Sequence, residues 1–215
     1  MPDLLVVDDH DLVRTGISRM LEDVDEIRVV GQAPSGEEAV QMARDLEPDV
    51  VLMDVKMPGI GGLEATRRML RHDETLKVLA VTVCDEEPFP SRLLQAGAAG
   101  YLTKGAELDE MVRAIKTVHA GQRYISPDIA QAMALKPFST PEASPLDLLS
   151  ERELQIMTMI VNCERVQVIA DKLCLSPKTV NTYRYRIFDK LGISSDVEMT
   201  LIAVRHDLLN AELTE

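Results

Sequence analysis

The sequence predicts a doubly wound α/β domain followed by a smaller all-α domain. Short apolar runs alternate with amphipathic stretches over about the first 120 residues, a pattern typical of a parallel sheet flanked by helices. Beyond a proline-rich segment near residue 140, only helical periodicity remains. A chain of 215 residues is longer than most single domains and can form one ordinary core and one small core.

Five strands and five helices are predicted in the first domain. The strands are continuous apolar runs, as in a parallel sheet covered on both faces, and lie at residues 4–7, 27–33, 50–53, 78–81 and 99–103. The helices are expected at residues 11–21, from Ser35, after Gly61-Gly62, at 88–96 and at 107–120. Ser35 and Glu38 form a capping-box pattern. This alternation predicts the flavodoxin-like strand order 2-1-3-4-5.

Polar residues follow four of these strands directly. Asp8 and Asp9 end the first strand, Asp54 the third, Thr82 the fourth and Lys104 the fifth. Because parallel strands end at the same edge of a sheet, these side chains are expected to meet in one crevice. Each residue alone is more often structural, for example a helix cap or a solvated charge. Their agreement at four strand ends favours a functional site.

The residue types at this edge suit phosphoryl chemistry. Three neighbouring carboxylates cannot all stay ionised without a compensating cation, and their oxygen atoms suit Mg²⁺ best. One carboxylate can then act as a nucleophile towards a phosphoryl group while the metal offsets charge. A lysine and a hydroxyl can bind the remaining phosphoryl oxygens. The predicted reaction is formation of an aspartyl phosphate on Asp54.

The boundary between the domains is marked by composition. Ser126-Pro127 has the pattern of a helix start and opens a short helix to about Leu135. Residues 136–145 contain three prolines and no helical periodicity, as in a linker. The predicted divisions are a first domain at 1–122, a linker with a short helix at 123–148 and a second domain at 149–215.

The second domain contains a candidate DNA-reading helix. Ser150 and Glu153 form a capping box that opens one helix, residues 166–174 form another, and Ser176-Pro177 begins a third. At helical spacing the core face of the third helix is Val180, Tyr183, Ile187 and Leu191, and the opposite face is Lys178, Asn181, Thr182 and Tyr185. A polar face of this kind is usually only solvated, but its hydrogen-bonding residues also suit the major groove.

Charge alone does not decide whether this helix binds DNA. Residues 150–215 contain 8 Lys and Arg against 10 Asp and Glu, so the second domain is not basic overall. Its positive charge is local. Between positions 172 and 190, Asp189 is the single acidic residue among Lys172, Lys178, Arg184, Arg186 and Lys190.

Residues 1–122 resemble the receiver domain of bacterial two-component response regulators. The resemblance rests on VVDDHDLVR, VLMDVKMPGIGG, the strand end Val81-Thr82 and GYLTKG. It implies that Asp54 is the phosphoacceptor, with a magnesium ion bound directly by Asp54 and Asp9, through water by Asp8, and by the carbonyl of Lys56. It also implies that Thr82 and Lys104 bind the phosphoryl group and that Tyr101 is an aromatic switch residue.

Residues 149–210 resemble the four-helix helix-turn-helix of the LuxR/FixJ/NarL output domains. LSERELQIM, LSPKTV and KLGISS carry this resemblance, and GLEATRRML, QAGAAGYLTKG, GQRYIS and LSPKTVNTYRYRIFDKL are similar to the GacA/UvrY group of global regulators. The resemblance implies a transcription factor, not an enzyme, that binds double-stranded DNA as a homodimer. It further implies a sensor histidine kinase of the hybrid type as phosphodonor and promoters of small regulatory RNA genes as targets.

The residues expected to contact DNA all lie on the third helix of this domain. They are Lys178, Thr179, Asn181, Thr182, Tyr185, Arg186 and Lys190. Two positions depart from the family pattern. Asn162-Cys163 stands where glycine is common in the first interhelical turn, and because Asn162 tolerates the left-handed conformation, the turn is expected to be kept. Val168 stands where an acidic residue is common.

Composition points to the cytoplasm. A hydrophobic fraction of 46%, a charged fraction of 27% and a net charge of −13 are those of a globular protein in water. No apolar stretch approaches the roughly 18 residues of a membrane helix, and no secretory pattern is present, so no membrane partner is expected. Cys84, Cys163 and Cys174 show no metal-ligand spacing and indicate a reducing compartment, with a redox role for Cys84 left open.

Two other classes of function share part of this pattern. A haloacid-dehalogenase-type phosphatase also uses an aspartate nucleophile with Mg²⁺, but that class needs a second aspartate two residues later, where this chain has Lys56. A protein-binding regulator whose helix-turn-helix no longer binds DNA stays open. A mobility-shift experiment with genomic fragments distinguishes it from a transcription factor.

Overall fold

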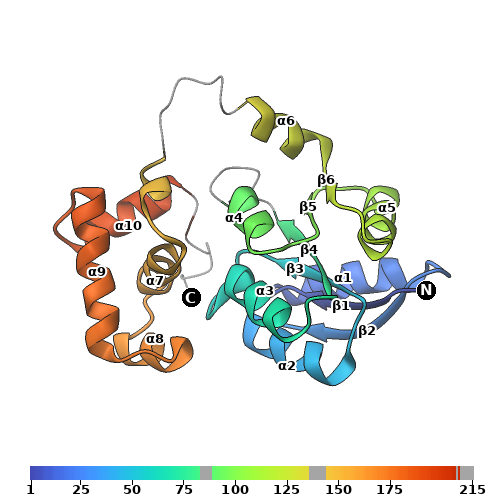
Figure 1. Ribbon diagram of the computed structural model, residues 1–215, viewed down its shortest axis with the longest axis horizontal. Coiled ribbons are helices and arrows are strands. Elements are labelled where there is room, and N and C mark those ends of the chain that lie inside the picture. Colours follow the sequence, from blue (N-terminus) through green and yellow to red (C-terminus); the bar gives the residue numbers. More distant parts are fainter. Residues whose placement is uncertain (83–88, 136–143, 207, 209–215) are drawn as a thin grey trace. The chain divides into compact units, whose positions relative to one another are not determined.

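The computed structural model describes residues 1–82, 89–135, 144–206 and 208 (Figure 1). Its contacts divide the chain into two compact units, the first drawn largely from residues 1–140 and the second largely from residues 141–215. Cys84 and residues 136–143 of the predicted linker lie outside the described residues. Among the helices of the described ranges, none combines the length and the apolar character needed to cross a lipid bilayer.

The first unit is a parallel sheet with helices on both faces (Figure 1). Its strands are β1 (Asp3–Val7), β2 (Arg28–Ala33), β3 (Val50–Asp54), β4 (Lys77–Thr82), β5 (Gly100–Thr103) and β6 (Tyr124–Ile125). They pair in the order β2-β1-β3-β4-β5-β6, and every pair is parallel. The helices of this unit are α1 (Asp11–Glu22), α2 (Gly36–Leu46), α3 (Gly61–His72), α4 (Phe89–Gln95), α5 (Leu108–His119) and α6 (Pro127–Leu135). The predicted flavodoxin-like order is confirmed.

One strand of the sheet was not predicted. The two-residue strand β6 extends the sheet beyond β5. The backbone amide of Tyr124 donates a hydrogen bond to the Ala99 carbonyl (3.2 Å), and that of Ser126 donates one to the Tyr101 carbonyl (3.0 Å). Two residues are too few to show an alternating pattern, so the sequence carried no signal for β6. Its close approach explains Gly100, where a Cβ atom would lie 2.5 Å from the Tyr124 carbonyl oxygen.

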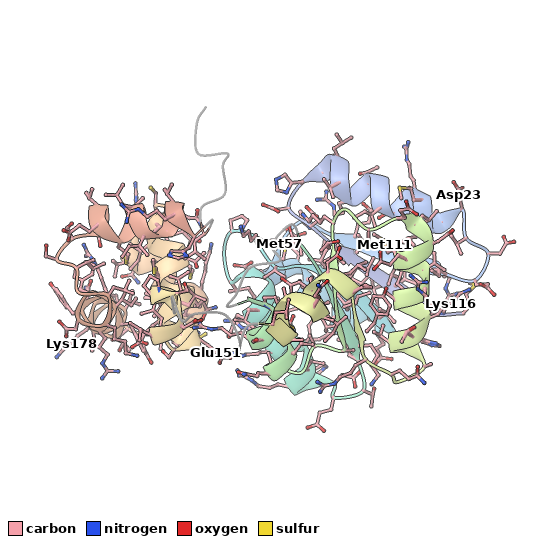
Figure 2. All side chains as sticks on the ribbon, turned by 90° about the horizontal axis from the view of Figure 1, so that it is seen from above. Asp23, Met57, Met111, Lys116, Glu151 and Lys178 are labelled. Carbon is pink, nitrogen blue, oxygen red and sulfur yellow. The ribbon has the colours of Figure 1, made fainter. Side chains whose placement is uncertain are left out.

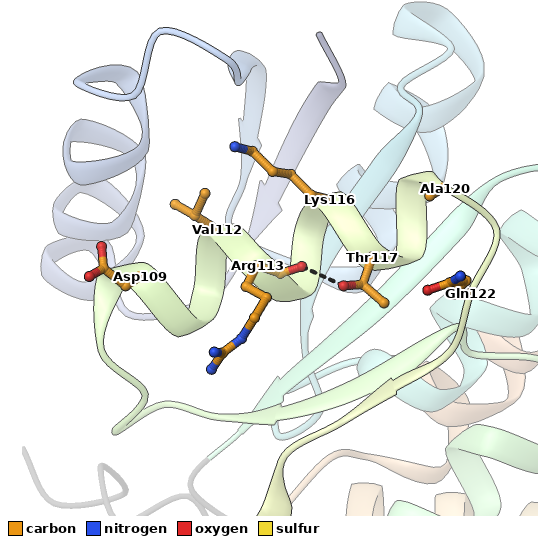
Figure 3. A pocket seen from close by; sticks show the side chains of 7 residues that line it. All are labelled: Asp109, Val112, Arg113, Lys116, Thr117, Ala120 and Gln122. Carbon is orange, nitrogen blue, oxygen red and sulfur yellow. Dashed lines mark hydrogen bonds between the residues drawn. The ribbon is translucent and has the colours of Figure 1, made fainter.

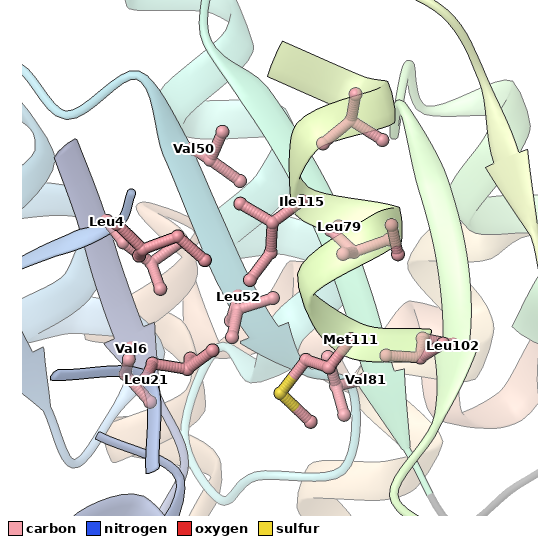
Figure 4. Close-up of a cluster of buried hydrophobic side chains, with 13 residues drawn as sticks. Leu4, Val6, Leu21, Val50, Leu52, Leu79, Val81, Leu102, Met111 and Ile115 are labelled. Atoms are coloured by element: carbon pink, nitrogen blue, oxygen red, sulfur yellow. The ribbon is translucent and has the colours of Figure 1, made fainter. Parts of the chain in front are cut away.

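Alternate side chains of each strand point into two separate cores. Leu52, Leu79 and other residues of the sheet face α1 and α5, where they pack around Ile115 (Figure 4). Ala80 and Tyr101 face the other side of the sheet and pack with residues of α4 and α6. Full burial of each large apolar side chain stabilises the fold by about 1.5–3 kcal/mol. This burial on both faces explains why the strands read as continuous apolar runs.

The second unit is a small bundle of helices. Within the described residues they are α7 (Glu151–Val161), α8 (Val166–Leu173), α9 (Pro177–Leu191) and α10 (Asp196–Arg205). Serine side chains cap three of them, with Ser150 on α7, Ser176 on α9 and Ser195 on α10, and the predicted capping box of Ser150 and Glu153 is present. The four-helix architecture predicted for this domain is confirmed.

A short 3₁₀ helix, η2 (Pro145–Leu148), precedes α7 in the segment assigned to the linker. The Ser144 hydroxyl caps it by accepting the Leu146 amide at 3.3 Å. The Leu146 side chain is fully buried, and η2 contacts α9. The end of the predicted linker segment is therefore part of the packed second unit.

The first interhelical turn is kept, as predicted, but its left-handed residue is Cys163 and not Asn162. Asn162 has φ −80°, whereas Cys163 has φ 60°. The amides of Cys163 and Glu164 donate to the carbonyls of Ile160 (2.9 Å) and Met159 (3.0 Å), which are the two bonds of a Schellman helix end. These bonds require the left-handed residue at Cys163, one position after Asn162. The left-handed conformation of a non-glycine residue is unfavourable by about 1–2 kcal/mol, so Cys163 makes this turn less stable than glycine would.

Candidate functional site

Three carboxylates meet at the carboxyl edge of the sheet. β1 leads into Asp8 and Asp9, and β3 ends at Asp54 on the neighbouring strand, where Val7 pairs with Met53. Ligand atoms of Asp8, Asp9, His10 and Asp54 all lie within 4.8 Å of one another. Asp8 and Asp54 are 2% and 3% exposed, so their charges are largely removed from water.

Lys104, just beyond β5, bridges two of these carboxylates. Its ammonium nitrogen Nζ lies 2.8 Å from Oδ2 of Asp54 and 2.6 Å from Oδ2 of Asp8. Burial disfavours the charged lysine, but the two carboxylates outweigh burial and raise the pKa of Lys104 above its usual value. One ammonium therefore faces three carboxylates, which leaves the cluster short of positive charge.

The carboxyl group of Asp54 is strongly perturbed. Desolvation by burial raises the pKa of Asp54 to about 6, against the opposing effect of Lys104. The amide of Lys56 donates to Oδ1 of Asp54 at 3.2 Å, so the backbone just after β3 lies against the proposed acceptor. Burial also raises the pKa of the Asp9 carboxyl. Both shifts show that burial disfavours the ionised form of these carboxyl groups.

The donor set fits a hard divalent cation. Asp8, Asp9 and Asp54 offer carboxylate oxygens within a small volume, as Mg²⁺ requires. Asp9 Oδ1 is buried and accepts no well-directed hydrogen bond, although Nδ1 of His10 lies 3.0 Å away. A buried carboxylate oxygen in this state is suited to a metal ligand.

Two residues near the cluster were missed by the sequence analysis. His10 lies with Nδ1 3.2 Å from Asp8 Oδ1, and its amide donates to the same oxygen at 2.9 Å. Arg14 of α1 donates from Nη1 to the Asp8 carbonyl at 2.7 Å. Together these contacts hold the turn that presents Asp8 and Asp9. The adjacency of His10 to the aspartate pair was the available signal, whereas the Arg14 contact depends on the path of α1.

The remaining predicted residues of this domain are placed by their strands. Thr82 ends β4 and pairs in register with Thr103 of β5, directly before Lys104. The Thr82 side chain lies outside what the structure describes. Tyr101 of β5 is fully buried in the core that includes Ala80 and Ile129. The predicted switch residue thus occupies an interior position.

Gly62 is required by the backbone next to the acceptor. A Cβ atom at Gly62 would lie 2.1 Å from the Asp54 carbonyl oxygen and 2.8 Å from the Val55 Cα atom. Gly62→Ala should therefore lower the free energy of unfolding by at least roughly 2 kcal/mol, as overpacking against backbone does. Gly16→Ala is the matched control, because a Cβ atom there meets nothing within 4 Å. Denaturant unfolding measures both, and a Gly62 variant as stable as the Gly16 variant would contradict the crowding.

The Asp54 carboxyl should make stability depend on pH. Its folded pKa of about 6 exceeds its reference value of 3.8, so the folded protein binds this proton more tightly than the unfolded chain. The contribution of Asp54 to stability therefore falls as pH rises from about 4 to above 6. With a chelator present, the stability of Asp54→Asn relative to wild type should rise by on the order of 3 kcal/mol over that range. Urea unfolding at several pH values measures it, and a pH-independent difference would refute the shift.

A surface hollow along α5 is separate from the predicted site. It is lined by Asp109, Val112, Arg113, Lys116, Thr117, Ala120 and Gln122 (Figure 3). The Thr117 hydroxyl donates to the Arg113 carbonyl at 2.7 Å within the helix, and Lys116 pairs with Glu26. These side chains serve local structure, and none of them belongs to the acidic cluster.

In the second unit, α9 carries every predicted DNA contact. Lys178, Thr182, Tyr185, Arg186 and Lys190 are exposed, and Thr179 and Asn181 are partly buried (Figure 2 labels Lys178). Val180, Ile187 and Phe188 are buried beneath this surface. Phe188 was not predicted there, whereas Tyr183 and Leu191 are only partly buried.

Two hydroxyl groups on α9 already have helix-internal partners. Thr179 Oγ1 lies 2.8 Å from the Ser176 hydroxyl at the N-cap, and Thr182 Oγ1 donates to the Lys178 carbonyl at 3.0 Å. Each hydroxyl oxygen keeps lone pairs with which it can accept a further bond. Tyr185 is 64% exposed, and its ring stands edge-on to that of Phe188.

The local positive charge of residues 172–190 is largely paired. Lys172 lies 3.1 Å from Glu164, Arg184 forms a two-point pair with Asp196, and Lys190 lies 2.6 Å from Glu153, so these cations hold helices together. Neither Lys178 nor Arg186 has a carboxylate partner among the described residues. The Arg186 guanidinium lies 5.7 Å from the centre of the Tyr183 ring.

Both units match known protein families. Residues 4–116 match the response regulator receiver domain, and residues 147–203 match the bacterial regulatory proteins of the luxR family. The response regulator GacA of Pseudomonas protegens is 70% identical over 210 residues, which cover 98% of this chain and 99% of the relative. The response regulator UvrY of Escherichia coli K12 is 56% identical over 213 residues, or 99% of this chain and 98% of the relative.

Solved structures agree with this assignment. A luxR-family two-component response regulator from Aurantimonas is 38% identical with a TM-score of 0.62, and the match covers 65% of this chain and 99% of that chain. RcsB of Salmonella enterica serovar Typhimurium, bound to promoter rprA in the presence of the phosphomimetic BeF₃⁻, has a TM-score of 0.72 at 22% identity over 95% of this chain and 99% of that chain, which supports the fold. The chain therefore belongs to the two-component response regulators and is a transcription factor that joins a receiver domain to a luxR-type DNA-binding domain.

Proposed function

We propose that a sensor histidine kinase phosphorylates Asp54 and that the phosphorylated protein binds promoter DNA as a dimer through α9. The observation that carries this proposal is the cluster at the edge of the sheet, where the carboxylates of Asp8, Asp9 and Asp54 gather and the ammonium of Lys104 bridges Asp8 and Asp54. The receiver domain is assigned to residues 1–122, the DNA-binding domain to residues 149–215, and the intervening residues to a linker.

The acidic cluster is the proposed magnesium site. Asp9 and Asp54 would bind the ion directly, Asp8 through water, and Lys56 through its carbonyl. A bound divalent cation offsets negative charge on the transferred phosphoryl oxygens. Because its ligands are carboxylates of raised pKa, the affinity for the ion is expected to fall as the pH drops through about 6.

Asp54 is the proposed nucleophile. An oxygen of its carboxylate attacks the phosphorus of the donor's phosphohistidine, a P–O bond forms, and the P–N bond to the imidazole breaks. Lys104 already lies 2.8 Å from Asp54 Oδ2 and can remain to bind a phosphoryl oxygen. Thr82, at the end of the adjacent β4, is proposed to bind a second oxygen. Binding of the phosphoryl oxygen by Thr82 would in turn change the position of Tyr101, the proposed switch residue.

On α9, base contacts and phosphate contacts are assigned to different residues. Asn181, Thr182 and Tyr185 lie centrally and are proposed to reach base edges. Lys178 and Arg186, whose charges lack carboxylate partners among the described residues, are proposed to contact phosphates, with Thr179 near the helix start. The N-terminus of a helix favours anions such as phosphate, which supports the proposal that Lys178 and Thr179, at the start of α9, contact the DNA phosphates.

Dimerisation is proposed to use α10. Val197, Leu201 and Val204 are 71%, 55% and 55% exposed, and their spacing places them on one face of the helix. An exposed apolar stripe of this kind is typical of an interaction surface. In a symmetric dimer the two α9 helices would read half-sites about 10–10.5 base pairs apart or a multiple of that distance.

The cellular setting is proposed from the resemblance to the GacA/UvrY group, whose members GacA and UvrY are response regulators. A hybrid sensor kinase is the proposed phosphodonor, and promoters of small regulatory RNA genes are the proposed targets. A cytoplasmic location is proposed, because the protein must meet both the kinase domain that phosphorylates it and the DNA that it binds. Genomic footprinting of the phosphorylated protein tests this regulon.

The division of labour on α9 gives a direct test of DNA binding. Lys178→Ala should weaken binding to operator and non-operator DNA alike and reduce the slope of log affinity against log salt by about one. Asn181→Ala should mainly lower the ratio of operator to non-operator affinity. Fluorescence titrations across salt and operator variants measure both effects. Identical behaviour of the two variants would contradict the assignment, and failure of the wild-type protein to bind any genomic fragment would refute DNA binding.

A further inference from the structure

Glu153 is the buried charged residue among the described residues of the second unit. Its side chain is 5% exposed, whereas the Lys190 side chain that it meets is 41% exposed. One carboxylate oxygen, Oε2, accepts the Ser150 amide at 2.7 Å and lies 2.6 Å from Nζ of Lys190. A single oxygen atom thus joins the N-terminus of α7 to the last turn of α9.

The capping box alone does not require a charge at this position. Glutamine serves as well as glutamate in that motif, because either side chain can accept the N-cap amide. A buried charge is instead tolerated when it is paired and hydrogen-bonded, and Lys190 supplies the pair. Burial disfavours the charged form, but Lys190 and Ser150 outweigh burial and lower the pKa of Glu153.

Arg152, next to Glu153 in the chain, makes a similar contact with α8, the other helix of the helix-turn-helix. Arg152 donates from Nη2 to the carbonyl of Leu173, the last residue of α8, at 2.9 Å. Adjacent side chains in the first turn of α7 therefore hold the ends of both α8 and α9. Asp196 of α10 holds α9 nearer its middle, through Arg184.

We infer that Glu153 is a positioning residue for α9, the helix proposed to read DNA. Lys190 then affects DNA binding because its ion pair with Glu153 holds α9 in place, and it does not bind a DNA phosphate. The inference deepens the proposed DNA binding by α9 and rests on it. It also revises the prediction that Lys190 contacts DNA, because the Lys190 ammonium is paired with the buried carboxylate of Glu153 in its own domain.

The geometry of α9 explains why this contact should affect specificity. Lys190 lies twelve residues beyond Lys178, which corresponds to about 18 Å along the helix. Release of the Lys190 end lets the helix tilt about its anchor at Arg184, six residues from Lys178, and a tilt of about 10° then moves the Lys178 end by about 1.6 Å. Directional bonds to base edges do not survive such a shift, whereas contacts between a flexible lysine and phosphates adapt to it.

The test uses five variants of the full-length protein, one of which, Lys190→Arg, keeps the positive charge at that position. Glu153→Gln keeps an acceptor for the Ser150 amide but removes the ion pair, Lys190→Met removes the ion pair from the other side, and the double variant completes a cycle. Asp189→Asn is the charge control, because it removes a negative charge beside Lys190 on an exposed residue that forms no ion pair within the part of the chain that the structure describes. Each protein is titrated, over a range of salt, with a duplex selected by the wild-type protein from a random library and with a shuffled duplex.

The expected result runs against simple electrostatics. Removal of an acidic charge should by itself tighten binding to DNA. Glu153→Gln should instead weaken binding to the selected duplex by about tenfold, equivalent to roughly 1.4 kcal/mol, and leave the shuffled duplex unchanged or slightly tighter. Lys190→Met should show the same loss with an unchanged salt slope, the double variant should lose no more, and Lys190→Arg should recover most of the affinity. Asp189→Asn should affect both duplexes alike.

The opposite pattern overturns the inference. If Lys190→Met weakens both duplexes equally and lowers the salt slope by about one, while Glu153→Gln tightens both, Lys190 is a phosphate contact.

A measurement without DNA keeps the two proposals separate. If the wild-type protein selects no duplex, the proposed DNA binding fails, but the positioning role is still decided by nuclear magnetic resonance. Lys190→Met should raise the pKa of the Glu153 carboxyl and speed hydrogen exchange of the amides in the last turn of α9. If both quantities keep their wild-type values, Glu153 does not hold α9 and the inference is wrong.

Discussion

Replacement of Asp54 by Asn is expected to abolish phosphorylation of the full-length protein. Asp54 is buried at the end of β3, where its carboxylate faces Asp8 and Lys104. An amide of the same size has no nucleophilic carboxylate oxygen, so no acyl phosphate can form on it. Incubation with acetyl phosphate and Mg²⁺, followed by intact-protein mass spectrometry, measures the loss of a hydroxylamine-labile phosphoryl addition.

Two controls sharpen this result. Asp45→Asn replaces an exposed carboxylate on α2 and should be labelled like the wild-type protein. A chelator should prevent labelling of wild type, because three carboxylates and one lysine cannot by themselves offset the charge of an incoming phosphoryl group. Full labelling of Asp54→Asn would move the acceptor to another residue and remove the basis of the proposed function.

Lys104→Ala is expected to separate phosphorylation from activation. Without its ammonium, the buried carboxylates of Asp8 and Asp54 repel each other and the pKa of Asp54 rises further, so phosphorylation at neutral pH should be slower. The variant should still accept phosphate, because the nucleophile and the proposed metal ligands remain. It should gain little DNA affinity when phosphorylated, because the phosphoryl group has lost one of its two proposed protein partners.

The magnitude of the loss can be bounded. A hydrogen bond to a charged group contributes about 1.5–3 kcal/mol, so bonds from Lys104 and Thr82 supply roughly 3–6 kcal/mol. Reversal of a 1:99 equilibrium needs about 5.5 kcal/mol. Loss of either bond therefore leaves too little free energy to complete the switch.

The measurement compares operator affinity before and after phosphorylation in wild type, Lys104→Ala and Lys116→Ala. Lys116 is an exposed lysine of α5 that pairs with Glu26, so its removal should leave activation intact. Mass spectrometry on the same samples corrects for incomplete labelling. A Lys104 variant that gains as much DNA affinity per phosphoryl group as wild type would contradict this mechanism.

Much of the architecture was determined by local patterns in the sequence. Continuous apolar runs specify strands buried on both faces, because a parallel sheet must cover both faces with helices. Their common direction brings Asp8, Asp9, Asp54 and Lys104 to one edge without knowledge of any contact between them. Serine at helix starts acts through nearby amides, so the capping box of Ser150 and Glu153 could also be read directly.

Other features depend on residues that meet only in the folded chain. The strand β6 exists because the backbone after α5 returns alongside β5, and its two residues carry no pattern of their own. The raised pKa of Asp54 comes from burial, which depends on the packing of the whole first unit. At the turn after α7, the hydrogen bonds of the helix end, and not residue preference, decided that Cys163 takes the left-handed conformation.

Lys190 shows the difference most clearly. Its spacing on α9 places it on the exposed side of a basic segment, so the sequence by itself assigned it to the residues that contact DNA. Periodicity reports the face of a helix that a residue occupies, but not the partner that another helix brings to it. Only the tertiary structure places the Glu153 carboxylate, 37 positions away in the chain, 2.6 Å from this lysine. The sequence therefore determined the fold and the acidic site through local periodicity and strand direction, whereas the charge pairing that orients α9 was decided by packing between distant helices.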